Sequence, residues 1–223
     1  MSSYSEGQIH QLADQMESAG LTPKHVTRLG QSFDTMLNIR RVLDGEATFQ
    51  FNQAVEPETP KKIIMPIALK PVTSDGVSGK DGIKDLEKAR YNVGDWVKDV
   101  MKQKVYVVTN GKVYKPVVLK GEDFTDDERV TSNIRKVAEE MKLVTPPAQL
   151  ARLLRKSVSD EELEQMGLYA LIVMHQPITG SGGFPNVLGL YRNDEGRWLN
   201  AYFGHAGHRW YRDLGFVFLA PQE

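Results

Sequence analysis

The stretch "NVLGLYRNDEGRWLNAYF", residues 186–203, decides the fold class. Two runs rich in apolar and aromatic residues flank the polar segment "RNDEGR", a pattern typical of two strands joined by a hairpin turn. Similar strand-like runs lie on either side, at 168–178 ("LYALIVMHQPI") and 215–220 ("GFVFLA"). Residues 168–220 therefore predict a mainly antiparallel sheet.

The clearest local signal in the chain predicts another hairpin upstream, in "KVYVVTNGKVYKPVVL", residues 104–119. Two β-branched runs flank Asn110-Gly111, the dipeptide preferred where both central residues of a type I′ turn take positive φ. Residues 63–72 ("IIMPIALKPV") form an extended run interrupted by prolines, which favours at most an edge strand.

Helical periodicity fills the remainder of this region. Apolar residues recur at helical spacing over 83–102, with a break possible at Gly94, and "TDDERVTSNIRKVAEEMKL" predicts a helix capped by Thr125. "TPPAQLARLLRK" and "SDEELEQMG" predict two further helices. The expected domain is α+β and covers residues 61–223. Its expected core comprises Trp96, Val107, Ile134, Leu150, Leu153, Ile172, Val173, Leu188, Leu190, Leu199, Tyr202 and Phe218.

The first 48 residues predict three short helices that form a small bundle. Gly20 ends the first, Thr22 and Pro23 start the second, and Gly45 ends the third. Residues 49–60, which include most of the stretch "QAVEPETPKK", lack periodicity and predict a linker. The expected organisation is thus a helical bundle (1–48), a linker (49–60) and the α+β domain.

The spacing of Gly20, Val26 and Leu29 resembles a helix-turn-helix, in which the second helix exposes one face to a partner. Lys24, His25 and Arg28 would lie on that face and are candidate binding residues. Residues 135–156 have a similar outline, with Arg152, Arg155 and Lys156 expected to be exposed. The acidic character of the N-terminal segment opposes DNA binding, so plain packing or protein docking is the alternative.

Charge is unevenly distributed along the chain. The formal net charge is −1, but residues 61–120 carry 13 Lys and Arg against six acidic residues. This basic middle third could contact phosphate, with Lys112 and Lys115 as candidate contacts, or it could pair with the acidic flanks. The pairing alternative is the simpler one.

The segment "FGHAGHRWYRDLGF", residues 203–216, concentrates His205, His208, Arg209 and Trp210 between glycines. The two histidines have metal-ligand spacing, and His175 is the third histidine in this half of the chain. However, Gly204 and Gly207 oppose a helix, and no glutamate stands between the histidines to serve as a metalloprotease base. A connecting loop is the favoured interpretation, without a metal or cofactor.

The composition excludes several classes of chemistry and a membrane-spanning helix. The chain of 223 residues contains no cysteine, which excludes disulfides, thiolate metal sites and a cysteine nucleophile. It has no apolar run long enough for a membrane span and no signal-peptide pattern at its N-terminus, so the cytoplasm is the expected location.

Four blocks also resemble, as an ordered set, a group of uncharacterised bacterial open reading frames of similar length. They are "LNIRRVLDGEATF", "KLVTPPAQLARLLRK", "DEELEQMGLYALIVMHQPI" and "LYRNDEGRWLNAYFGHAGHRWYRDLGFVF". The resemblance implies a bacterial, cytoplasmic protein with a compact C-terminal α+β unit. It implies no catalytic residue.

These observations favour a non-enzymatic protein that binds another macromolecule, with a protein partner slightly preferred. Nucleic-acid binding by the helix-turn-helix-like units and the basic segment is the first alternative. A small hydrolase or metal-dependent enzyme centred on His175, His205 and His208 is the second. Convergence of these three imidazoles would favour the enzyme.

Overall fold

The computed structural model describes residues 4–48 and 64–221, and the chain divides into two compact units, residues 1–61 and 62–223. Each unit is described by itself. The predicted linker, residues 49–60, lies outside the described residues.

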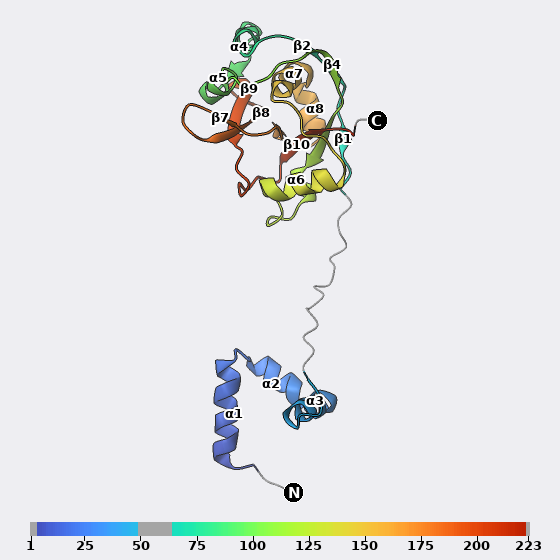
Figure 1. Ribbon diagram of the computed structural model, residues 1–223, viewed down its shortest axis with the longest axis vertical. Helices are drawn as coiled ribbons and strands as arrows, with labels where there is room; N and C mark the ends of the chain where they lie inside the picture. The colour runs from blue at the N-terminus through green and yellow to red at the C-terminus, as the bar shows by residue number, and fades with distance from the viewer. Residues whose placement is uncertain (1–3, 49–63, 222–223) are drawn as a thin grey trace. The chain divides into compact units, whose positions relative to one another are not determined.

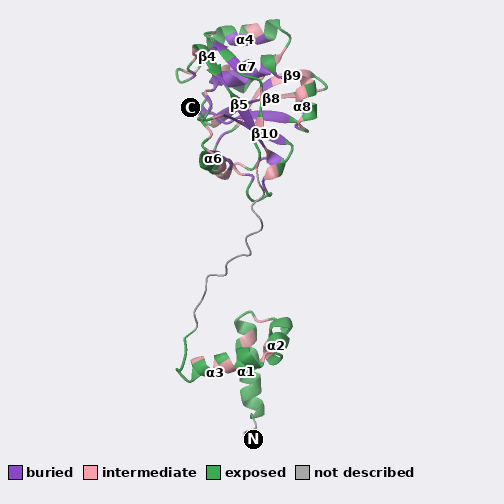
Figure 2. Cartoon of the chain, turned by 90° about the vertical axis from the view of Figure 1, so that its right-hand side faces the viewer, coloured by how far each residue is buried: buried purple, intermediate pink, exposed green. Residues whose placement is uncertain are grey.

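The first unit contains the three predicted helices: α1 (Glu6–Ser18), α2 (Pro23–Gly30) and α3 (Phe33–Leu43). Ser5 and Thr22 form capping boxes at the starts of α1 and α2, and the Ser32 side chain caps α3. The expected bundle core is absent here, because none of residues 4–48 is buried. Figure 2 shows these helices as mostly exposed.

The second unit is α+β, as predicted. Its main sheet has eight strands in the order β1-β5-β10-β6-β8-β9-β3, with β7 paired to β8. The strands are β1 (Ile67–Ala68), β3 (Asn92–Val93), β5 (Pro116–Lys120), β6 (Ala170–Val173), β7 (Ile178–Thr179), β8 (Pro185–Asn193), β9 (Gly196–Phe203) and β10 (Leu214–Leu219). The pairs β10–β6 and β3–β9 are parallel and the others antiparallel.

The hairpin predicted at "RNDEGR" is confirmed: β8 and β9 pair antiparallel, with Asn193 opposite Gly196. Its turn places only Gly196 at positive φ, 124°. The short β1 lies at the sheet edge, as its prolines predicted.

Helices cover both faces of this sheet, and Figure 1 shows α6 and α7 on opposite sides of β10. On one face, α4 (Gly79–Lys88), α5 (Asp95–Val100), α7 (Gln149–Ser157) and α8 (Asp160–Gln165) contribute to a core with Leu171, Leu190 and Leu199. On the other face, α6 (Thr131–Glu140) packs over Ile172, Phe216 and Phe218. A 3-10 turn spans Gly121–Asp123.

The hairpin predicted at Asn110-Gly111 is wrong. Strand β4 (Asn110–Tyr114) pairs with β2 (Val72–Asp75) in a separate two-stranded sheet, whereas β5 pairs with β1 and β10. Gly111 has a φ of 70°, but Asn110 does not take the positive φ that a type I′ turn needs. Residues 104–108 form no strand and place Tyr106 in the core.

Three further expectations need correction. Trp96 and Val107 are 50% and 64% exposed and lie outside the core, and Tyr202 is only partly buried, whereas the other nine predicted core residues are buried. Helix α6 begins at Thr131 instead of just after Thr125, whose hydroxyl bonds Glu128 in a separate turn. Arg152 and Arg155, expected on an exposed face, are buried in α7 because their charges find partners inside the unit.

Across the described residues, no helix combines the length and the apolar character that crossing a bilayer requires.

Candidate functional site: a groove at the strand ends

A groove with a volume of about 1060 Å³ lies on the second unit. We call it the strand-end groove. Three segments line it: 103–105 before β4, 144–148 before α7 and 175–179 after β6. Five single residues complete the lining: Val107, Thr109, Lys112, Tyr114 and Leu219.

The topology of the sheet explains this position. Strands β6 and β10 are parallel neighbours, with Val173 opposite Val217, so their carboxyl ends point to the same edge. After β6, residues 174–177 belong to no strand, and the chain then pairs with β8 through the short strand β7. Ligand sites in sheets with parallel strands commonly lie outside such carboxyl ends.

His175 lies at the base of the groove, but it is structural. Its Nε2 accepts a hydrogen bond from the Leu188 backbone N–H at 2.9 Å, and its Nδ1 lies 2.6 Å from the Gln176 carbonyl oxygen. The ring is therefore neutral, with Nδ1 protonated. Burial lowers the pKa of His175 to about 4. Neither nitrogen is free to bind a metal or to accept a substrate proton.

Arg135 of α6 holds the same segment from the opposite face of the sheet. Its guanidinium donates to the carbonyl oxygens of Met174 and His175 at 2.9 and 2.7 Å. These two bonds satisfy carbonyl groups that the interrupted β6 ladder would leave unpaired. The base of the groove is thus fixed in shape.

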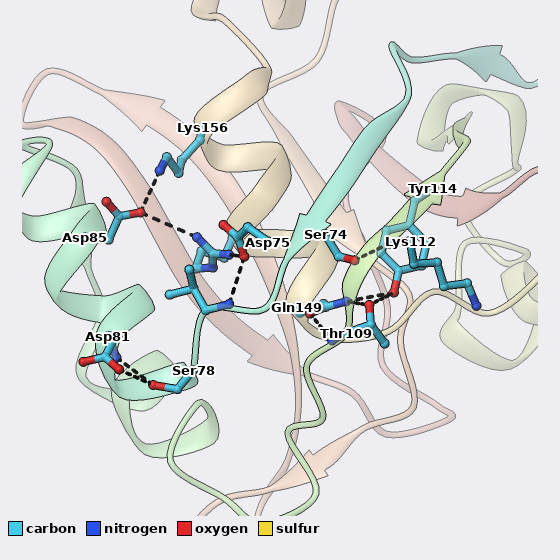
Figure 3. A network of polar contacts seen from close by, with 12 residues as sticks. Ser74, Asp75, Ser78, Asp81, Asp85, Thr109, Lys112, Tyr114, Gln149 and Lys156 are labelled. Carbon is cyan, nitrogen blue, oxygen red and sulfur yellow. Dashed lines mark hydrogen bonds and ion pairs between the residues drawn. The ribbon is translucent and has the colours of Figure 1, made fainter.

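The β4 wall is fixed by Gln149, the first residue of α7 (Figure 3). The Gln149 side chain accepts from the Thr109 N–H at 2.9 Å and donates to the Tyr114 hydroxyl at 2.8 Å and to the Thr109 hydroxyl at 2.5 Å. Gln149 is buried, so every one of these polar groups has a partner in place of water.

Behind this wall, buried Arg152 joins the two-stranded sheet to α4. It donates to Asp75 at the end of β2 and lies 3.6 Å from Asp85 of α4, which also pairs with Lys156 at 2.6 Å (Figure 3). The hydrogen bond from Arg152 lowers the pKa of Asp75. No local sequence pattern predicts this network, because its members are distant along the chain.

The groove is apolar and basic. Val105 and Val107 are 66% and 64% exposed, and the half-buried Pro147 and Pro177 add further apolar surface. Lys104 and Lys112 are its charged residues, and none of the described lining residues is acidic. The Lys112 ammonium lies 5.6 Å from the centre of the Tyr114 ring.

Part of the predicted basic segment is in ion pairs. Lys98 pairs with Glu87 inside the segment at 2.8 Å, whereas Lys120 and Lys70 pair with Glu122 and Glu162 of the acidic flank at 2.9 and 2.7 Å. Within the described ranges no acidic residue lies in ion-pair range of Lys104, Lys112 or exposed Lys115. Lys112 lines the groove, and Lys115 does not.

The His205–Trp210 loop supplies hydrogen-bond partners to the first residues of α6. The carbonyl oxygens of His208 and Ala206 accept from the N–H groups of Thr131 and Ser132 at 3.0 and 2.9 Å, which satisfies donors at the helix start. Buried Trp210 donates from its indole N–H to the Thr131 hydroxyl at 2.9 Å.

The polar residues of that loop are more exposed. Arg209 lies 3.3 Å from Asp127, and the rings of His205 and His208 are 5.5 Å apart. Burial, with a smaller contribution from His205, lowers the pKa of His208. The described parts of the chain hold no group of three His, Asp or Glu side chains arranged for a metal ion.

The N-terminal candidates lie on α2, and Lys24, His25 and Arg28 are all exposed. His25 has a structural role as well, because its Nδ1 accepts from the Thr22 backbone N–H at 3.1 Å. Val26, expected to pack inward, is 44% exposed.

Comparisons with known proteins give no match: none of the protein-family models, the curated proteins or the solved structures compared with this chain is similar to it. The site is therefore interpreted from its own geometry.

Proposed function

We propose that this protein is a non-enzymatic binding protein whose strand-end groove holds an extended acidic segment of a partner protein. The observation that carries the proposal is the composition of the groove. Exposed valines and two half-buried prolines offer apolar contacts, and two lysines lie among lining residues that include no acid in the described structure. An extended chain with acidic and apolar side chains complements this surface in both charge and polarity.

The size and rigidity of the groove support a macromolecular segment. Its volume of about 1060 Å³ reaches the upper end of the range of roughly 300–1,000 Å³ for small-molecule pockets. Its base and its β4 wall are held by Arg135 and Gln149. A groove that is already ordered loses little conformational entropy when it binds.

Nucleic acid is the weaker alternative. Lys98 and Lys120 are in ion pairs, and the formal net charge of the chain is −1. Among the described lining residues of the groove, Tyr114 is the one aromatic ring apart from His175, and its hydroxyl is hydrogen-bonded to Gln149 and Thr109. Single-stranded nucleic acids usually need several exposed rings on which bases stack.

Catalysis is also disfavoured by the geometry. His175 has both ring nitrogens in hydrogen bonds inside the fold, and in the described residues no three His, Asp or Glu side chains gather into a group that could hold a metal ion. A general base needs a free nitrogen within reach of a substrate proton.

The test is selection of peptides from a random twelve-residue display library on the immobilised full chain. We expect enriched peptides to alternate acidic and apolar residues. Reversal of both groove charges, Lys104→Glu with Lys112→Glu, should weaken binding of the selected peptides on the order of 100-fold. The acidic peptide side chains would then face acidic side chains of the groove. Lys136→Glu, an exposed lysine of α6 outside the groove, is the matched control and should leave affinity unchanged.

Two outcomes would reject the proposal: enrichment of peptides without acidic residues, or equal binding by the doubly reversed variant and the control. Binding of oligonucleotides would support the alternative instead. In that case the logarithm of affinity should fall by about 0.9 per duplex phosphate contact for each unit of log salt.

A further inference from the structure

The first unit displays its apolar residues to solvent. Phe33 and Leu43 of α3 are 79% and 81% exposed, and Ile9 and Leu12 of α1 are more than half exposed. None of residues 4–48 is buried. Figure 2 shows the same distribution on all three helices.

Helices of this length need packing partners. The helices have 13, 8 and 11 residues, and isolated helices shorter than about 12–15 residues are marginal in water. Within the unit α2 and α3 contact each other, but no comparably extensive contact joins α1 to either of them. The exposed faces of α1 and of the α2–α3 pair therefore lack the cover that would stabilise them.

The charges on these helices indicate which kind of surface could cover their exposed apolar faces. Helix α1 carries Glu6, Asp14 and Glu17 and no lysine or arginine. The α2–α3 pair carries four basic residues against Asp34 and the C-cap residue Asp44, which pairs with Arg40 at 3.4 Å. The basic residues are Lys24, Arg28, Arg40 and Arg41. One copy of the unit thus offers an acidic apolar helix and a basic apolar helix pair.

We propose that the first unit is a homodimerisation module, in which α1 of one copy packs on the α2–α3 pair of a second copy. If a two-fold axis relates the two copies, the same contact forms twice, because each copy supplies an α1 helix and an α2–α3 pair. Pairing of opposite charges fixes which faces meet, and burial of the exposed apolar residues supplies the association energy.

The first measurement is the mass of the full chain by sedimentation equilibrium over a range of concentrations. We expect a mass twice that of the 25.1 kDa chain, with dissociation on dilution. Leu12→Glu with Phe33→Glu should give a monomer. The matched control is Tyr211→Glu, which changes a 78% exposed aromatic residue of the second unit and should remain dimeric.

A charge exchange tests the pairing even if single variants lose helicity. One variant replaces Glu6, Asp14 and Glu17 by Lys, and the other replaces Lys24, Arg28, Arg40 and Arg41 by Glu. Each alone presents like charges at both contacts and should be monomeric. Their mixture restores opposite charges at both contacts and should form a one-to-one heterodimer.

A wild-type chain that stays monomeric at every concentration would overturn the proposal. So would a dimer that survives Leu12→Glu with Phe33→Glu, or a charge-exchanged pair that does not associate. Peptide binding by the groove is measured on the other unit, so either proposal can fail without the other.

Discussion

His175 combines deep burial with two hydrogen bonds, and its ionisation is therefore linked to stability. Its pKa of about 4 in the folded protein lies below the ordinary value of 6.5. Below pH 6.5 the unfolded chain binds the proton more readily, so stability is present above that pH and is lost as pH falls toward 4. The loss from pH 7.5 to pH 5 should be about 2 kcal/mol from this residue.

Urea unfolding of the full chain at several pH values measures this effect. His175→Gln keeps a hydrogen-bonding side chain that cannot gain a proton in this pH range. In this variant the free energy of unfolding should therefore lose most of its slope against pH between pH 7.5 and pH 5. His205→Gln, a change at an exposed position, should keep it. An unaltered slope in His175→Gln would show that other groups set the acid sensitivity.

Arg152 is the second residue whose environment predicts a large effect. It is buried and interacts with Asp75 and Asp85. Arg152→Ala should lower the free energy of unfolding by about 2–4 kcal/mol, chiefly because it leaves a cavity where the long buried side chain packs; the carboxylates that it leaves, Asp75 and Asp85, are partly exposed to water.

Lys156→Ala provides the comparison, because Lys156 also pairs with Asp85 but is exposed. Lys156→Ala should lower the free energy of unfolding by less than about 1 kcal/mol. Similar losses for the two variants in denaturant titrations would contradict the assignment of Arg152 as the central residue of the network.

Among the elements, the β8–β9 hairpin depends on one glycine. Gly196 has a φ of 124°, a conformation that side chains rarely adopt, and faces Asn193 across the turn. Gly196→Ala should destabilise the protein by about 1–3 kcal/mol. Asp194→Ala, in the same turn, has no positive φ to maintain and should have little effect on the thermal unfolding midpoint. Equal midpoints for both variants would refute this account of the turn.

The elements also show why local pattern predicted some parts of the fold and failed at others. The β8–β9 hairpin is local, with its turn signal between two runs that pair with each other. At Asn110-Gly111 the same signal was misleading, because β4 and β5 find partners far along the chain, in β2 and in β10 and β1. Strand β5 is buried over Pro116–Leu119, as befits a strand in the interior of a sheet.

Helix α7 illustrates a second limit. Its periodicity correctly predicted a helix, but not that Arg152 and Arg155 are inside. Their partners Asp75, Asp85 and Asp160, and the Tyr191 carbonyl, come from other elements. For the groove, Lys112 was among the predicted binding residues, whereas the valines and prolines around it carry no sequence signal of their own.

Among residues 4–48 and 64–221, every buried hydrophobic residue of the molecule lies between Val72 and Leu219. We therefore expect a fragment of residues 62–223 to unfold in one transition at the midpoint of the full chain, measured by circular dichroism of the aromatic region. A midpoint lowered by several degrees would mean that residues 1–61 contribute to the stability of the second unit.

The central claim is that the strand-end groove holds an acidic segment of another protein. Methyl NMR spectra of the full chain, recorded during titration with a peptide selected on it, test this most directly. We expect the largest shifts at the methyl groups of Val105, Val107 and Val144, which line the groove, and none at Val26 on α2. Shifts at Val26, with the three groove valines unchanged, would contradict the account.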